Sequence, residues 1–308
     1  MADADDNAYR DYLSHLLVVI PALNEEASLR TLAASMREAL PGVPVLVVND
    51  GSTDNTGLLA RELGACVLDM PHNVGVGCAM QAGYQYAARH GYEAVLRIDS
   101  DGQHPPAEAP KLIRRHLETG ADLVVGTRYG ERGRHISTAF REAGSHFLAR
   151  FLSVICRTQV TDPTSGFWLV SSPLLHAFAR EFPTDYPEPE GIALLRRLGY
   201  SYAEAPVAFR ERRHGRSSIG FIDAIYFIVK VGIALVVDRV RRIDRRNERR
   251  HITHMLATYG GARTTGGCGT RAPWRQAQQA GGTPPAPPGQ QADNSKGRSA
   301  AGRQEDAP

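Results

Sequence analysis

The sequence has few cysteines, and their spacing excludes the usual structural roles of that residue. The four cysteines stand far apart and form no C-x-x-C pair; they are Cys66, Cys78, Cys156 and Cys268. We therefore expect reduced thiols, as in a cytosolic protein, and no structural zinc site. The N-terminus also lacks the basic start and apolar core of an export signal, which favours a cytoplasmic location.

Several catalytic signatures are absent as well. The sequence contains no phosphate-binding G-x-x-x-x-G-K-[ST] loop and no G-x-S-x-G nucleophile elbow. Gly75 and Gly77 follow an apolar run, but the third glycine or alanine of a dinucleotide fingerprint falls on Met80. Hydride transfer and acyl transfer therefore lose support.

No apolar run is long enough to cross a bilayer. The longest, residues 221–237, is shorter than the roughly twenty residues that a span needs, and it contains Asp223 and Lys230. An arginine-rich stretch at 239–242 follows it directly. Two interpretations are open: a helix lying in the membrane interface, or a helix packed on the protein core.

Positive charge is concentrated in one region. Residues 209–250 hold twelve Lys or Arg against five Asp or Glu, a surplus of seven, so the net charge of +3 leaves 3 − 7 = −4 for the rest of the chain. Such a region suits an anionic membrane, nucleic acid or a phosphorylated substrate, and the alternative is a solvated helix face. Arginine dominates the cluster, which favours phosphate.

What the sequence does contain is an alternation of apolar runs with helical patterns. With 308 residues and 42% hydrophobic content, the chain is long enough for a full core. The runs that we predict as strands are 16–20, 43–48, 65–68, 94–98 and 121–126. Continuous apolar strands separated by helices predict an α/β fold, with a mostly parallel sheet and helices on both faces.

Composition divides the chain into four parts. We predict a flexible N-terminus over 1–13, an α/β domain over 14–218, an apolar and basic interfacial helix over 219–250, and a disordered tail over 251–308. Gly, Pro, Gln, Ala and Arg dominate the tail, which has too few apolar residues to form a core.

Two carboxylates follow the strand at 94–98. Asp99 and Asp101 stand two residues apart before a turn, and their mutual repulsion is relieved by a cation between them. Together with the amide of Gln103 they are hard oxygen donors, which suit Mg²⁺ or Mn²⁺. The alternative is an Asp-rich turn that caps the helix beginning near Ala107.

Other polar residues follow neighbouring strands. The acidic clusters at strand ends comprise Asn24 with Glu25, Asp50, and Asp99 with Asp101. In open parallel sheets ligands bind beyond the carboxyl ends of the strands, so these clusters predict a metal and nucleotide site there. Arg128 follows a further strand at the same edge. Glu188 and Glu190 begin a predicted helix, as caps or as a general base.

Four ordered motifs together resemble the family 2 glycosyltransferases. They are Val19–Glu25, Val47–Asp54, Asp99–Pro105 and Arg213–Ser218. The resemblance spans about residues 14–245 and is closest to the polyprenyl-phosphate (dolichyl-phosphate) mannose synthase branch. Asn49 is a departure, because an acid is common there in the family.

The resemblance implies a GT-A fold and a role for each matching residue. The nucleotide would be bound by Pro21, Ala22, Asn24, Glu25, Asp50 and Ser100, with Asp50 as the carboxylate that contacts the base. The metal, Mg²⁺ or Mn²⁺, would be held by Asp99, Asp101 and Gln103. Phosphates would be faced by Arg128, Arg141, Arg213 and Arg216, with Ser217 beside them on the acceptor side. We predict Asp101, Arg128 and Arg141 as catalytic residues, and add Glu190 from its place at the start of a predicted helix, where the alternative is a helix cap.

The function implied is that of an inverting, metal-dependent glycosyltransferase. It would move a hexose from a GDP- or UDP-sugar to a polyprenyl phosphate, in peripheral contact with an anionic membrane on its cytoplasmic face and without nucleic acid. One alternative keeps the fold but uses a hydroxyl acceptor, which needs a base. Another is a sugar-nucleotide binding module without turnover.

Overall fold

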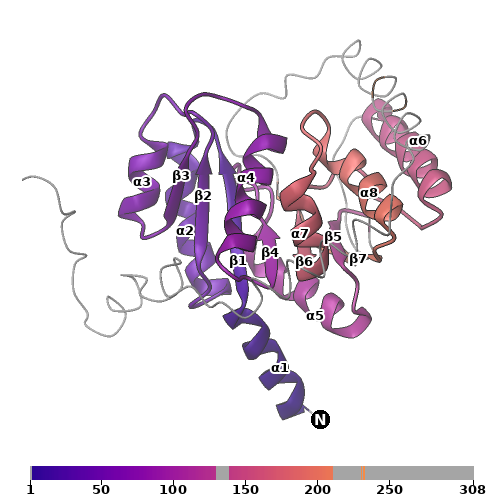
Figure 1. Ribbon diagram of the computed structural model, residues 1–308, viewed down its shortest axis with the longest axis horizontal. Helices are drawn as coiled ribbons and strands as arrows, with labels where there is room; N and C mark the ends of the chain where they lie inside the picture. The colour runs from indigo at the N-terminus through magenta and orange to yellow at the C-terminus, as the bar shows by residue number, and fades with distance from the viewer. Residues whose placement is uncertain (1, 130–138, 211–229, 231, 233–308) are drawn as a thin grey trace, which may run out of the picture. The chain divides into compact units, whose positions relative to one another are not determined.

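The computed structural model describes residues 2–129, 139–210, 230 and 232 (Figure 1). These residues belong to the first of two compact units, which ends at Ala272. The predicted tail over 251–308 lies outside the described residues, as does the predicted interfacial helix over 219–250 apart from Lys230 and Gly232. Within the described part of the chain, no helix is long and apolar enough to cross a membrane.

The described residues contain one seven-stranded sheet with the strand order β3-β2-β1-β4-β6-β5-β7. Its strands are β1 (Leu16–Ala22), β2 (Val45–Asn49), β3 (Cys66–Asp69), β4 (Ala94–Arg97), β5 (Leu123–Thr127), β6 (Trp168–Ser171) and β7 (Tyr202–Pro206). Neighbouring strands pair in parallel, except that β6 is antiparallel to both β4 and β5. The prediction of a mostly parallel sheet is therefore confirmed.

Helices cover both faces of this sheet (Figure 1). They are α1 (Ala2–Ser14), α2 (Glu26–Ala39), α3 (Thr56–Glu62), α4 (Val76–Arg89), the 3-10 turn η1 (Pro106–Glu108), α5 (Ala109–Thr119), α6 (Ala139–Cys156), α7 (Ser172–Arg180) and α8 (Pro187–Leu198). Leu17 and Val19 of β1 belong to the hydrophobic cluster under α4, α6, α7 and α8. Leu16, Val18 and Ile20 belong to the other, under α2, α3 and α5. Burial on both faces explains why the strand sequences are continuously apolar.

The N-terminus differs from its prediction as a flexible segment, because residues Ala2–Ser14 form α1. Tyr9, Tyr12 and Leu13 lie on one side of this helix and pack against the cluster that contains α2 and α5. This apolar contact favours an ordered helix over a free segment. The acidic composition of the first residues did not indicate it.

The cysteines agree with their prediction only in part. Neither Cys78 nor Cys156 forms a disulfide, as expected. Cys66 is disulfide-bonded, so the expectation of a reduced thiol is wrong at that position.

The reversed strand β6 determines which loops meet at the functional edge. In a parallel sheet, the segments that follow the strands lie at the carboxyl edge. Because β6 runs the other way, it is the segment before it, residues 161–167, that lies at this edge. Residues from the second half of the fold are thereby brought next to the Asp-x-Asp turn after β4.

Candidate active site

The loops that follow β1 and β2 are joined by hydrogen bonds. The side-chain oxygen of Asn24 accepts a bond of 2.8 Å from the N–H of Thr53, and the N–H of Asn24 donates to Ser52 Oγ at 3.0 Å. The N–H of Glu25 donates to Thr56 Oγ1 at 2.9 Å. Two of the predicted nucleotide-binding residues are thus held in place by the loop between β2 and α3.

Asp50 organises the glycine-rich loop that precedes α4. Its side chain is buried, and its two oxygens accept the N–H of Val74 at 2.8 Å and the N–H of Gly75 at 3.0 Å. Gly75 has φ +88°, a conformation that glycine adopts without strain. The carboxylate therefore has a structural role here, and its predicted contact with a base stays a prediction.

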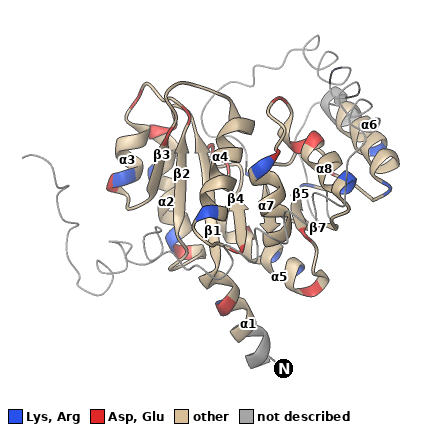
Figure 2. Cartoon of the chain, viewed as in Figure 1, with Lys and Arg blue, Asp and Glu red and all other residues tan. Residues whose placement is uncertain are grey.

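Arg97 at the end of β4 is a site residue that sequence reasoning missed. Its side chain is only 3% exposed. Its Nε donates to Asp99 Oδ1 at 3.0 Å, and its Nη2 pairs with Glu188 Oε1 of α8 at 2.8 Å. A charged residue inside an apolar strand pattern, directly before two aspartates, was the signal available. The first turn of α8, whose acidic residues are shown in Figure 2, is thus tied to the Asp-x-Asp turn.

His104 closes the Asp-x-Asp turn from the other side. The backbone N–H of Asp99 donates to His104 Nδ1 at 3.0 Å, and the ring stacks on Phe167 with centroids 5.1 Å apart. Burial lowers the pKa of His104 below its usual value, which keeps the ring neutral and Nδ1 free to accept. Sequence analysis gave this residue no role.

Asp101 and Gln103 lie side by side within the turn. The backbone N–H of Gln103 donates to Asp101 Oδ1 at 3.0 Å, and its side-chain Nε2 donates to Oδ2 at 2.6 Å. Gly102 between them has φ +77°, which allows this tight turn.

This donor set fits a divalent cation. The Asp101 carboxylate and the Gln103 side-chain amide carry oxygen donors of the kind that Mg²⁺ and Mn²⁺ prefer, and in this structure the amide nitrogen of Gln103 faces Asp101. The two aspartates differ in their present partners, because Oδ1 of Asp99 already accepts a hydrogen bond from Arg97 Nε. Among the described residues no group of three or more His, Cys, Asp or Glu is arranged as a metal site, so the predicted set depends on the amide oxygen.

Arg128 lies at the same edge but is bound to a buried acid. Its Nε and Nη2 donate to the two oxygens of Asp162, both at 2.7 Å, and Nη2 also donates to Thr164 Oγ1 at 2.7 Å. Asp162 is fully buried. Burial alone would lower the pKa of Arg128, but the hydrogen bond and charge of Asp162 raise it instead. The predicted contact of Arg128 with phosphate stays a prediction.

Of the remaining predicted site residues, some lie in the described part of the chain and others lie outside it. Pro21 and Ala22 end β1, and Ser100 is buried in the Asp-x-Asp turn. Glu190 lies in the first turn of α8, where its N–H donates to Tyr186 O at 3.1 Å. The residues outside the described part are Arg213, Arg216, Ser217 and the side chain of Arg141, whose backbone belongs to α6.

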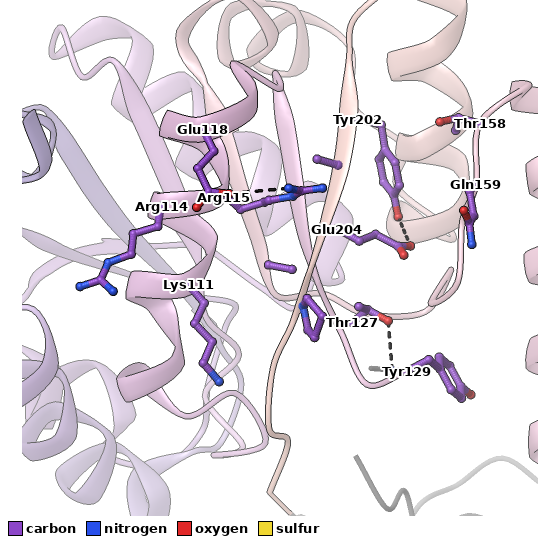
Figure 3. Close-up of a pocket in the computed structure, with 13 residues that line it drawn as sticks. Lys111, Arg114, Arg115, Glu118, Thr127, Tyr129, Thr158, Gln159, Tyr202 and Glu204 are labelled. Atoms are coloured by element: carbon purple, nitrogen blue, oxygen red, sulfur yellow. Dashed lines mark hydrogen bonds and ion pairs between the residues drawn. The ribbon is translucent and has the colours of Figure 1, made fainter. Parts of the chain in front are cut away.

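A cavity of about 710 Å³ lies beside β7, between α5 and the segment that contains Thr158 and Gln159 (Figure 3). None of the predicted site residues lines it. Several of its charged groups have partners: Lys111 pairs with Glu108, Arg115 pairs with Glu118, and Glu204 accepts hydrogen bonds from Thr161 and from the hydroxyl of Tyr202. Thr127 and Tyr129, the sequence neighbours of the predicted site residue Arg128, do line the cavity, so it reaches the carboxyl end of β5.

The Asp-x-Asp turn and the linked loops after β1 and β2 lie together at the carboxyl edge of the sheet, and comparison with known proteins identifies the family. A model of the family described as glycosyl transferase family 2 matches residues 17–177. The chain belongs to glycosyl transferase family 2. It is a glycosyltransferase, and the predicted GT-A fold is confirmed.

Relatives within this family are named for transfer to lipid phosphates. The polyprenol monophosphomannose synthase of Mycolicibacterium smegmatis is 31% identical over 245 residues, which cover 74% of this glycosyltransferase and 91% of that relative. The undecaprenyl-phosphate mannosyltransferase of Micrococcus luteus is 29% identical over 235 residues, covering 71% and 94%.

A solved structure shares the fold of this glycosyltransferase. It is glucosyl-3-phosphoglycerate synthase from Mycobacterium tuberculosis in complex with Mn²⁺, UDP and glucosyl-3-phosphoglycerate. The TM-score is 0.54 at 28% sequence identity, and the match covers 73% of this chain and 79% of that one.

Proposed function

We infer that this glycosyltransferase moves a hexose from a nucleotide-diphospho-sugar to a polyprenyl phosphate, with inversion at the anomeric carbon and with a divalent metal ion. The observation that carries the proposal is the pair of Asp101 and Gln103, held side by side at the carboxyl edge of the sheet. Relatives that match most of this chain and are named for polyprenyl-phosphate mannosyl transfer support the choice of acceptor.

In this proposal the donor lies over the carboxyl ends of β1, β2 and β4. The loop held by Asn24 and the loop held by Asp50 position the nucleotide, and Asp101 with Gln103 would hold the metal ion. When bound, that ion supplies positive charge that stabilises the diphosphate as it leaves. The attacking group is the acceptor phosphate, which is already anionic, so no side chain has to remove a proton from it.

The membrane contact rests on sequence alone. In the proposal, the apolar run at 221–237 and the arginines at 239–242 lie at an anionic lipid surface, while Arg213, Arg216 and Ser217 face the acceptor phosphate. The test is flotation of the purified protein with anionic vesicles. Flotation at low salt but not at high salt supports this contact. A protein that stays out of the lipid fraction at both salt concentrations contradicts it.

A soluble hydroxyl acceptor is the second candidate. It is favoured by the structural likeness to an enzyme solved with glucosyl-3-phosphoglycerate, a product that is not a lipid. A hydroxyl must lose a proton as it attacks, so this reaction needs a general base. Glu188 and Glu190 in the first turn of α8 are the predicted candidates, and of these Glu188 is paired with Arg97.

A transfer assay with the purified full chain separates the two candidates. GDP- and UDP-sugars are offered with either a short polyprenyl phosphate or 3-phosphoglycerate, in Mn²⁺, in Mg²⁺ or in EDTA. We expect glycolipid formation that needs the metal, and Glu190→Gln should retain it within a few-fold. Product on 3-phosphoglycerate alone, lost in Glu190→Gln, would replace the proposal by the hydroxyl reaction.

A further inference from the structure

Arg97 occupies a position at which the strand pattern calls for an apolar residue. β4 is buried on both faces, and a guanidinium in such a place is destabilising unless acids and hydrogen bonds compensate for its lost hydration. Burial alone would lower the pKa of Arg97, but the charges of Asp99 and Glu188 raise it. The residue is therefore a permanent buried cation held between two carboxylates.

The two carboxylates come from different halves of the fold. Asp99 begins the Asp-x-Asp turn after β4, and Glu188 lies in the first turn of α8. Arg97 contacts the first at 3.0 Å through Nε and the second at 2.8 Å through Nη2. A planar fork with donors on two sides makes both contacts at once, which the single ammonium of a lysine does not reproduce.

The segment before β6 closes a third side of the guanidinium. A Cβ added to Gly166 would lie 2.7 Å from Arg97 Nη2, 2.9 Å from its Cζ and 2.9 Å from Asp99 Oδ2. These separations are too short for any side chain, so glycine is required for the backbone to approach. The backbone at Gly166 therefore lies directly against the Arg97 guanidinium and against Asp99.

One donor of the fork has no partner. Arg97 Nη1 is buried without a hydrogen bond, and the buried hydroxyl of Tyr84 is in the same state. An arginine placed only to satisfy the core would be expected to have its donors paired. In this structure the Arg97 guanidinium contacts Asp99 and Glu188 and leaves the hydrogen-bond donors of Nη1 unpaired.

We propose that Arg97 is a positioning residue, which fixes the orientation of Asp99 in the Asp-x-Asp turn and, through Glu188, the place of the first turn of α8 beside that turn. The inference rests on the proposed function, because it takes the turn to hold the divalent ion. The proposal gives Glu188 the role of an ion-pair partner of Arg97 and not that of a proton acceptor in the reaction. It also makes one side chain responsible for the spacing between the Asp-x-Asp turn, at Asp99, and the first turn of α8, which carries the predicted catalytic residue Glu190.

Metal binding distinguishes positioning from a simple charge effect, because Arg97→Lys keeps the charge and removes only the planar guanidinium, so a pure charge effect predicts no change in affinity for this variant. If Arg97 acted only through its positive charge, removing that charge would strengthen cation binding at the adjacent acids. If it orients Asp99, then Arg97→Lys, which keeps the charge and loses the fork, weakens binding. Partners that orient metal ligands typically contribute about 10- to 100-fold in affinity.

The experiment is a titration of the full-length protein with Mn²⁺ in the presence of UDP or GDP, followed by the loss of the free Mn²⁺ signal in electron paramagnetic resonance. Arg97→Lys is expected to raise the Mn²⁺ dissociation constant about 10-fold or more. Arg197→Lys is the matched control, since Arg197 lies in the last turn of α8 with its side chain 11% exposed and pairs with Glu181 at 3.2 Å. Its Mn²⁺ affinity should stay within twofold of the unsubstituted protein.

Glu188→Gln provides a second variant with a different expected pattern. It keeps an oxygen acceptor for Arg97 and leaves Asp99 held, so Mn²⁺ affinity should be unchanged. The tie to α8 weakens, and the KM for the acceptor should rise several-fold with the KM for the donor unaltered.

Unchanged or tighter Mn²⁺ binding in Arg97→Lys, with only a lower melting temperature, would overturn the proposal and leave Arg97 as a core ion pair. If Arg97→Lys does not fold, an unaltered acceptor KM in Glu188→Gln overturns it instead. Failure of the unsubstituted protein to bind Mn²⁺ with either nucleotide is a separate result, because it contradicts the metal-dependent function itself.

Discussion

Asp101→Ala is expected to lower metal-dependent transfer by about 1,000-fold while the protein stays folded. Loss of metal-based charge stabilisation corresponds to several kcal/mol of barrier, and roughly 4 kcal/mol gives a factor of that size. The fold should tolerate the change, because Asp101 is only half-buried and bonds to Gln103 within its own turn. Initial rates over a range of Mn²⁺ concentrations, with a thermal melt of the same sample, measure both effects.

The matched control is Asp11→Ala on α1, where the side chain is 83% exposed and far in sequence from the turn. It should retain full turnover. Near-normal, EDTA-insensitive transfer by Asp101→Ala would mean that the Asp-x-Asp segment is an ordinary turn and that the metal assignment is mistaken.

Arg128→Met is expected to lower the free energy of unfolding by about 3–5 kcal/mol, the usual cost of leaving one partner of a buried ion pair uncompensated. The reason is that Asp162 is fully buried and receives both of its side-chain hydrogen bonds of 2.7 Å from the Arg128 guanidinium. Urea unfolding followed by circular dichroism provides the measurement.

Arg61→Met is the control for this ion pair. Arg61 also pairs with an aspartate, Asp69, but both side chains are about half exposed. Its loss should cost less than about 1 kcal/mol. The double variant Arg128→Met, Asp162→Leu should be destabilised by less than the sum of its single variants, since it leaves no unpaired charge. Additive costs would show that the two side chains do not depend on each other.

The strands were predictable because burial on both faces leaves a continuous apolar run. β1, β2 and β4 begin and end within a few residues of the predicted runs. The reversal of β6 was not predictable, because Trp168–Ser171 is buried like the parallel strands of the sheet, and pairing between distant strands leaves no local pattern. The helix α1 was missed since its stability comes from contacts with the core.

The sequence predicted which edge of the sheet carries the site, but it did not predict the hydrogen bonds and ion pairs within the site. Acidic residues after strands pointed to the carboxyl ends of β1, β2 and β4, where Asn24, Asp50 and Asp101 do lie. Their partners come from segments with unremarkable sequence. Asp162 lies in the segment before β6, for which the sequence predicted no site residue, and the pair of Arg97 with Glu188 joins two elements that only the folded chain brings together.

The reversed strand also constrains how the chain assembles as it leaves the ribosome. β4 borders β1 on one side, but its other neighbour is β6, which is made more than seventy residues later along the chain. β5 has no neighbouring strand when it is made, since both of its neighbours, β6 and β7, follow it in sequence. Until Ser171 has emerged, the nascent chain has one open strand edge on β4 and an apolar β5 with nothing to pair with, which is the state that chaperones shield from aggregation.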